Sequence, residues 1–135
     1  MSGSAVDTNV LIRYLSNETT AVELLHGALR ETPDDVFVPM AVVGEMLYGV
    51  ERSRRKLENY VHYTDFLMSF PLLPVTKEIA CCYAETKSRL VTKGINLPEN
   101  DIWIAASAIQ SGLTLLTFDQ HFTLIENLEV KGIDV

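Results

Sequence analysis

Apolar residues along this chain form short strand-like runs separated by longer helical stripes. The strand-like runs stand at residues 5–6, 36–38, 72–75 and 113–118. Apolar positions spaced three or four residues apart predict helices at about 10–15, 21–30, 41–50, 54–69 and 76–93, and from residue 100 or 101 onward. Strands that alternate with helices in this way are typical of an α/β fold, with a parallel sheet flanked by helices.

Residue types at several helix ends support these boundaries. Thr19 or Thr20 is expected to cap the helix at 21–30, and Thr76 the helix that ends at Lys93-Gly94. No linker, repeat or low-complexity stretch divides the chain. Residues 1–135 are therefore expected to form a single domain.

Composition narrows the class of protein without naming a function. The chain is 47% hydrophobic and 21% charged, which is ordinary for a soluble globular protein. The longest uncharged stretch, 102–118, contains polar residues and Gly112, so it predicts a helix, a turn and a strand rather than a membrane span. No signal-peptide pattern follows Met1, so the expected location is the cytoplasm. The adjacent Cys81 and Cys82 are expected to be core thiols.

Four acidic residues stand close to the expected strand ends and helix starts. Asp7 follows the strand at 5–6, and Asp119 follows the strand at 113–118. Asp101 opens an apolar helix, while Glu45 lies inside another. Because the carboxyl ends of parallel strands form one crevice, these side chains are expected to converge there. Converging carboxylates repel one another, and one or two hard divalent cations would neutralise them.

Each acid also has an ordinary structural explanation. Asp101 suits a helix cap, and Asp119 suits a turn before a short helix. Asp7 and Glu45 are harder to explain in this way, because both lie among apolar residues where an unpartnered carboxylate is costly. The four together favour a shared site over four separate structural roles.

At this point the chain resembles a known family, the PIN domain, and within it the small prokaryotic toxins of VapC type. The resemblance rests on Asp7-Thr8-Asn9-Val10-Leu11, on Glu45 in its apolar helix, and on residues 93–106 and 115–122. It covers nearly the whole chain. It implies a three-layer α/β/α fold with a central parallel sheet, an acidic pocket that binds Mg²⁺ or Mn²⁺, and metal-dependent cleavage of RNA. The positions that match the family's four acids are Asp7, Glu45, Asp101 and Asp119, and Thr117 matches a hydroxyl position.

The resemblance also suggests roles for these residues. Asp7 is expected to be the central metal ligand, with Glu45 and Asp101 completing the shell of one ion and Asp119 holding or orienting a second. No histidine or cysteine shows metal-ligand spacing with the acids. His121 is near Asp119, where a substrate contact is one alternative, and a structural or solvated role is the expected one. The residues expected to orient the carboxylates are Thr8, Asn9 and Thr117.

The net charge of −7 argues against a protein held on nucleic acid by bulk electrostatics. Two bound divalent ions would add four positive charges and raise this value to −3. Basic residues elsewhere are candidates for phosphate contacts, although a solvated helix face is the more ordinary explanation for such a group. The densest basic group is Arg52, Arg54, Arg55 and Lys56.

A toxin-like chain implies a small antitoxin partner. The apolar and aromatic residues between Glu45 and Met68 exceed what one helix pair in a small domain needs to bury, so some are expected to form an exposed groove. This set is Met46, Leu47, Tyr48, Tyr60, Tyr63, Phe66, Leu67 and Met68. An amphipathic antitoxin segment would fill that groove and point a basic side chain toward the acids. A core role or a homodimer contact explains the same residues equally well.

Other functions remain open from the sequence. A housekeeping PIN-type RNA-processing nuclease would use the same acids, and a non-catalytic acidic module would only bind protein. A phosphatase with an aspartate nucleophile is a further rival. Haloacid-dehalogenase-like phosphatases, however, require a second aspartate two residues after the first, where this chain has Asn9.

Overall fold

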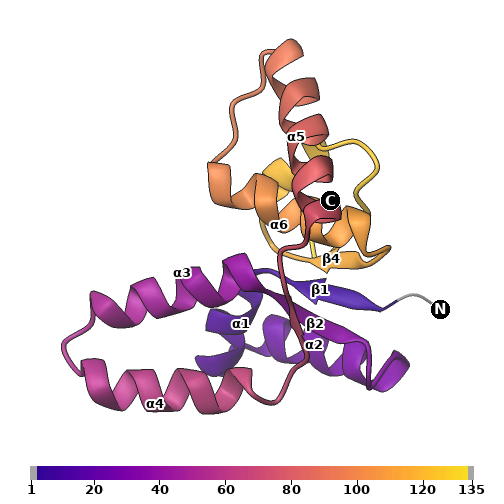
Figure 1. The fold of residues 1–135 in the computed structure, drawn as a ribbon. Coiled ribbons are helices and arrows are strands. Elements are labelled where there is room, and N and C mark those ends of the chain that lie inside the picture. The colour runs from indigo at the N-terminus through magenta and orange to yellow at the C-terminus, as the bar shows by residue number, and fades with distance from the viewer. Residues whose placement is uncertain (1–2, 134–135) are drawn as a thin grey trace.

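The computed structural model describes residues 3–133, and five parallel strands form its central sheet (Figure 1). The strand order is β3-β2-β1-β4-β5, so the first strand lies in the middle. β1 pairs with β2 on one side, Ser4 opposite Val36, and with β4 on the other, Ser4 opposite Thr114. The strands are β1 (Ser4–Val6), β2 (Val36–Pro39), β3 (Leu72–Leu73), β4 (Thr114–Leu116) and β5 (Val130–Lys131).

Helices cover both faces of this sheet. Helices α1 and α2 lie on one side and α5 and α6 on the other, while α3 and α4 form a hairpin whose loop lies far from the sheet (Figure 1). The helices are α1 (Thr8–Leu15), α2 (Thr19–Glu31), α3 (Met40–Glu51), α4 (Lys56–Leu67), α5 (Lys77–Thr92) and α6 (Glu99–Gln110), with a short 3-10 helix, η1 (Gln120–Leu124). The expected three-layer α/β/α fold with a central parallel sheet is therefore confirmed.

The core fills the two spaces between the sheet and its helices. Ala5, Val6 and Leu115 are fully buried on the central strands. Such continuous apolar runs are typical of parallel strands that are covered on both faces. Helix α6 is so enclosed that its buried face extends beyond one stripe, with Ile102, Ile104 and Ala108 all buried.

The strand order creates a crevice beside β1. The chain moves outward from β1 through β2 to β3, and then returns across the sheet to β4 on the other side of β1. The direction of winding therefore reverses between β1 and β4. In parallel sheets of this kind the ligand crevice lies outside the carboxyl ends of the strands at the reversal. Asp7 follows β1 at this point, and Thr117, Phe118 and Asp119 follow β4.

Several expected boundaries differ from the structure. The strand expected at 72–75 is limited to Leu72–Leu73, and the one at 113–118 to Thr114–Leu116. The two-residue strand β5 had no prediction, because a run this short carries no readable periodicity. Residue 1, where the single domain was expected to begin, and residue 135, where it was expected to end, lie outside the described residues.

Two expectations about individual side chains are wrong. Helix α2 is capped neither by Thr19 nor by Thr20, because Glu18 occupies the N-cap and makes no capping hydrogen bond with its side chain. Cys81 is exposed rather than a core thiol, while Cys82 is half-buried. The cap expected at Thr76 is confirmed, since its hydroxyl accepts a 3.2 Å hydrogen bond from the backbone N–H of Ile79. Among the described residues, no helix is both long and apolar enough to cross a membrane.

Candidate metal centre and active site

Asp7 lies at the junction of β1 and α1, and both of its carboxylate oxygens accept hydrogen bonds. It is the N-cap of α1, and its Oδ1 accepts a 2.8 Å hydrogen bond from the backbone N–H of Thr8. Its Oδ2 accepts a 2.7 Å hydrogen bond from the hydroxyl of Thr117, which follows β4. The side chain is therefore held from the start of α1 and from the segment after β4, and Asp7 is only 5% exposed.

The burial of Asp7 has an electrostatic consequence. Burial raises its pKa from the usual 3.8 to about 6, because the ionised form loses solvation. The hydrogen bonds from Thr117 and Thr8 oppose this effect, while the neighbouring Asp101 and Glu45 carboxylates add to it. The crevice therefore favours neutralisation of Asp7, either by a proton or by a cation.

Glu45 and Asp101 reach Asp7 from two other helices. Glu45 lies on α3, and its Oε1 accepts a 2.8 Å hydrogen bond from the hydroxyl of Thr8. Asp101 lies in the first turn of α6, where Pro98 rather than Asp101 is the N-cap. Carboxylate oxygens of Asp7, Glu45 and Asp101 lie within 4.8 Å of one another. Three acids from distant parts of the sequence thus meet at one point.

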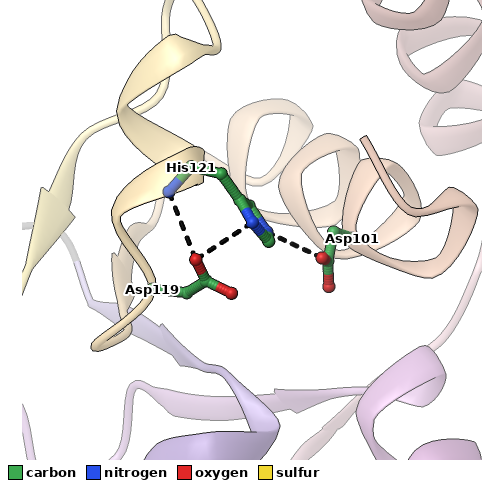
Figure 2. Close-up of side chains that lie close together, drawn as sticks. All are labelled: Asp101, Asp119 and His121. Carbon is green, nitrogen blue, oxygen red and sulfur yellow. Dashed lines mark hydrogen bonds and ion pairs between the residues drawn. The ribbon is translucent and has the colours of Figure 1, made fainter. Parts of the chain in front are cut away.

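Asp119 joins the group through His121 (Figure 2). Asp119 is the N-cap of η1, and its Oδ1 accepts a hydrogen bond from the backbone N–H of His121. The imidazole of His121 lies between two carboxylates, with Nε2 2.7 Å from Asp101 Oδ2 and Nδ1 3.0 Å from Asp119 Oδ1. The ring of His121 therefore bridges the acid of α6 and the acid that caps η1.

The position of His121 corrects the expectation that no histidine lies where it could share a metal ion with the acids. Ligand atoms of Asp101, Asp119 and His121 lie within 4.8 Å of one another and form a second group of possible metal ligands. Asp101 belongs to both groups. Burial raises the pKa of Asp101, while the adjacent His121 lowers it. The feature of the sequence that pointed to His121 is its position two residues after Asp119, a spacing that can bring both side chains to one turn.

The three residues expected to orient the carboxylates have different contacts. Thr117 donates to Asp7 and accepts a 3.0 Å hydrogen bond from the backbone N–H of Asp119, so it links two of the acids. Thr8 links Asp7 to Glu45. Asn9 makes no hydrogen bond to a carboxylate of the described residues; its Oδ1 accepts a 3.3 Å hydrogen bond from the backbone N–H of Phe118, which ties α1 to the segment that carries Asp119.

The acids lie in an open pocket of about 490 Å³. Arg13, which sequence reasoning missed, also lines it, one helical turn after Asn9. The guanidinium of Arg13 lies 4.9 Å from the centre of the Phe118 ring and 3.7 Å from Glu18. The lining residues are Asp7, Thr8, Asn9, Ile12, Arg13, Glu45, Pro98, Asn100, Asp101, Asp119 and His121.

The basic group expected to contact phosphates lies outside this pocket. Arg54, Arg55 and Lys56 line a separate hollow at the turn between α3 and α4. Arg55 and Lys56 also form ion pairs there with Glu58 and Glu51. The sequence pattern identified a basic turn but could not place it relative to the acids. Arg52, the fourth residue of this basic group, follows the end of α3. Its guanidinium carbon lies 6.0 Å from the ring centre of Tyr48, which is on α3.

The apolar residues expected to form a groove divide between the core and the surface. Met46 and Leu67 are buried and pack in the core. Exposed apolar side chains on the surface of α4 and at its end include two from the expected set, Tyr60 and Met68. We call the α4 patch the four residues Leu57, Tyr60, Val61 and Met68, which are 79%, 49%, 51% and 81% exposed.

Similar proteins of known sequence support a common ancestry for this arrangement. The chain is 27% identical to "Ribonuclease VapC2" of Rickettsia felis over 130 residues, which cover 96% of each chain. It is 30% identical to "Ribonuclease VapC2" of Haemophilus influenzae over 112 residues, which cover 83% of each chain.

Solved structures with the same fold come from two-protein complexes. The chain matches a crystal structure of VapBC2 from Rickettsia felis bound to a DNA fragment, with a TM-score of 0.86, 25% identity, and coverage of 95% of this chain and 96% of that one. It matches FitAcB from Neisseria gonorrhoeae with a TM-score of 0.79, 27% identity, and coverage of 93% and 94%. A family model described as "PIN domain" matches residues 5–128, which include all four acids. The chain therefore belongs to the PIN domain family.

Proposed function

We propose that this protein is a metal-dependent endoribonuclease that hydrolyses RNA phosphodiester bonds as the toxin of a toxin–antitoxin pair. The observation that carries the proposal is the convergence of Asp7, Glu45, Asp101 and Asp119 in one pocket of a PIN-domain chain. The relatives named as VapC ribonucleases support RNA as the substrate. RNA is plentiful in the cytoplasm, where we expect the protein to act.

The donor set fits a hard divalent cation. Carboxylate oxygens are the preferred ligands of Mg²⁺ and Mn²⁺, and neighbouring carboxylates require a counter-charge. Asp7, Glu45 and Asp101 would hold one ion. Asp101 and Asp119 would hold a second, with His121 beside them. When bound, such an ion would lower the pKa of a coordinated water and neutralise charge on the phosphate.

The chain's own residues prepare this site. Thr8 and Thr117 hold both oxygens of Asp7, so the carboxylate has a defined orientation. Thr117 also holds the backbone of Asp119, which keeps the two acids in register. In the absence of a cation the carboxylates would repel an RNA phosphate, so we expect substrate binding at the pocket to depend on the ion.

An RNA cleavage assay tests the proposal. Purified wild-type protein should cleave single-stranded RNA with Mg²⁺ or Mn²⁺ and should lose this activity in EDTA. Asp119→Asn should be inactive while its circular dichroism spectrum stays native. If the wild type cleaves no RNA with either ion, the nuclease proposal fails.

The proposed partner is a small antitoxin. The solved complexes VapBC2 and FitAcB support a two-protein assembly for this fold. We propose that an amphipathic antitoxin segment covers the α4 patch, because exposed apolar side chains spaced along one helix suit a helix that packs against them. The competing assignment is a homodimer contact at the same patch. Size-exclusion chromatography with light scattering would reveal it as a molar mass of two chains for the purified protein.

A housekeeping PIN-type nuclease and a non-catalytic acidic module are the alternatives. The housekeeping nuclease would cleave RNA by the same chemistry but would not harm the cell that makes it. Harmless expression of the active protein would therefore favour this alternative. The second requires no metal and no cleavage. The four pocket acids argue against the second, because a cluster that only binds protein does not need to bury Asp7 at an electrostatic cost.

A further inference from the structure

A second hollow adjoins the acidic pocket along α3. It has a volume of about 370 Å³ and is lined by Ala41, Gly44, Glu45, Tyr48 and Asn100. Glu45 and Asn100 also line the acidic pocket. We call this second hollow the α3 groove; it meets the acidic pocket at these two shared residues.

An exposed aromatic ring lines the α3 groove. Tyr48 is 64% exposed, and it lies three residues after Glu45, so the two side chains are neighbours on one face of α3. Gly44 leaves the groove open, since a Cβ built at this position would meet nothing within 4 Å. The guanidinium of Arg52, one turn further along, lies 6.0 Å from the Tyr48 ring centre. An aromatic face and a positive charge thus lie together beside the α3 groove.

We propose that the α3 groove holds the RNA strand beside the cleaved phosphate, with a base stacked on Tyr48 and Arg52 close to the backbone phosphate. This inference rests on the proposed nuclease function. A strand whose phosphate enters the acidic pocket must leave it through an open side, and the α3 groove shares Glu45 and Asn100 with that pocket. Stacking on an aromatic ring accepts every base, which suits a groove with few groups that could read one.

The distribution of charge supports RNA as the occupant. Arg13 lines the acidic pocket, and Arg52 lies beside Tyr48, which lines the α3 groove. A polyanion that spans the cation-loaded pocket and the α3 groove would therefore meet a guanidinium at each of them. An apolar protein segment would gain more from the α4 patch, which lies on another helix.

Binding and cleavage by Tyr48 variants test this placement. Tyr48→Ala removes the ring, Tyr48→Phe keeps it, and Tyr60→Ala removes a comparably exposed ring from the α4 patch. Affinity is measured by fluorescence anisotropy with a short labelled single-stranded RNA of mixed sequence, in Mg²⁺. The background is Asp119→Asn, which should be inactive but keeps Asp7, Glu45 and Asp101 as ligands for one ion. Steady-state cleavage is measured with Asp119 restored.

We expect Tyr48→Ala to weaken RNA binding on the order of 5- to 100-fold, which is the range for loss of one stacked base. KM should rise by a similar factor while kcat changes little, and Tyr48→Phe and Tyr60→Ala should bind like the parent protein. Equal binding by all variants would overturn the inference, as would equal losses in Tyr48→Ala and Tyr48→Phe, which would indicate a hydroxyl contact. If the wild type cleaves RNA while these variants show no difference, only the α3 groove assignment fails; if it neither binds nor cleaves RNA, both proposals fail.

Discussion

The hydroxyl of Thr117 donates a 2.7 Å hydrogen bond to Oδ2 of Asp7, although the two residues are 110 positions apart in the sequence. Thr117 is fully buried, and its oxygen also accepts from the backbone N–H of Asp119. A single side chain therefore connects the acid after β1 to the acid after β4. This connection makes Thr117 a structural determinant of the site as well as a neighbour of it.

Replacement of Thr117 by valine should destabilise the protein with little change in volume. The substitution leaves Asp7 Oδ2 without a donor and the Asp119 N–H without an acceptor, at a cost of about 1–3 kcal/mol for each unsatisfied buried group. Urea unfolding of the metal-free protein measures the change, and Thr117→Ser, which keeps the hydroxyl, is the control. A Thr117→Val protein as stable as the wild type would show that the hydrogen bond contributes little.

Asp7→Asn should abolish cleavage and stabilise the metal-free protein at high pH. The folded pKa of Asp7, about 6, lies above the usual 3.8, so ionisation of Asp7 opposes folding. This penalty is absent below about pH 4, grows between about pH 4 and 6, and is complete above it. At 1.36 kcal/mol per pKa unit, its full size is about 3 kcal/mol.

Urea unfolding at about pH 8 and about pH 4 measures the free energy of unfolding with and without this penalty. Asp7→Asn should be more stable than the wild type at the higher pH and nearly equal at the lower one. Asp34→Asn is the matched control, because this aspartate is exposed and lies outside the pocket. An Asp7→Asn protein that is less stable at both pH values would mean that its hydrogen bonds to Thr8 and Thr117 outweigh the electrostatic penalty.

Divalent ions should raise the melting temperature of the wild type. A ligand that binds only the folded protein adds about 2.7 kcal/mol at 100 times its dissociation constant. Differential scanning fluorimetry across a Mg²⁺ or Mn²⁺ titration measures this, with Ca²⁺ for comparison. The double variant Asp7→Asn/Asp101→Asn should show almost no shift, and an equal shift in this variant would place the bound ion elsewhere.

His121→Ala should lower the melting temperature of the metal-free protein and enlarge the increase produced by Mg²⁺. The imidazole lies 2.7 Å from Asp101 and 3.0 Å from Asp119, so its removal leaves two carboxylates without the group that screens them. A bound ion would then no longer have to displace the imidazole. A smaller Mg²⁺ effect in His121→Ala would instead make His121 a metal ligand.

The α4 patch should bind the antitoxin. Co-expression of the tagged protein with the product of the neighbouring gene should yield a co-purified complex and restore growth. Val61→Asp places a charge among Leu57, Tyr60 and Met68 and should abolish both effects, while the exposed Glu78→Lys on α5 should preserve them. Harmless expression of active protein, with no partner recovered, would reject the toxin assignment and leave the nuclease assignment standing.

Much of the fold was readable from the sequence, because local patterns govern it. The alternation of short apolar runs with helical stripes predicted the order of β1 to β4 and of the helices between them. The same pattern also indicated that Asp7 and Glu45 have a special role, because a carboxylate within apolar surroundings needs a compensating partner. The sequence therefore identified the four acids and the α/β class without any knowledge of distances.

Distances between remote residues were decided only by the tertiary structure. Whether His121 faces solvent or two carboxylates depends on how η1 lies against α6, and no local pattern encodes that relation. Arg13 lines the acidic pocket, while Arg54 and Arg55 lie at the tip of the α3–α4 hairpin. All three arginines are exposed, and the sequence alone does not distinguish their positions. Periodicity reports which face of an element is apolar; the packing of elements against one another determines which polar groups meet.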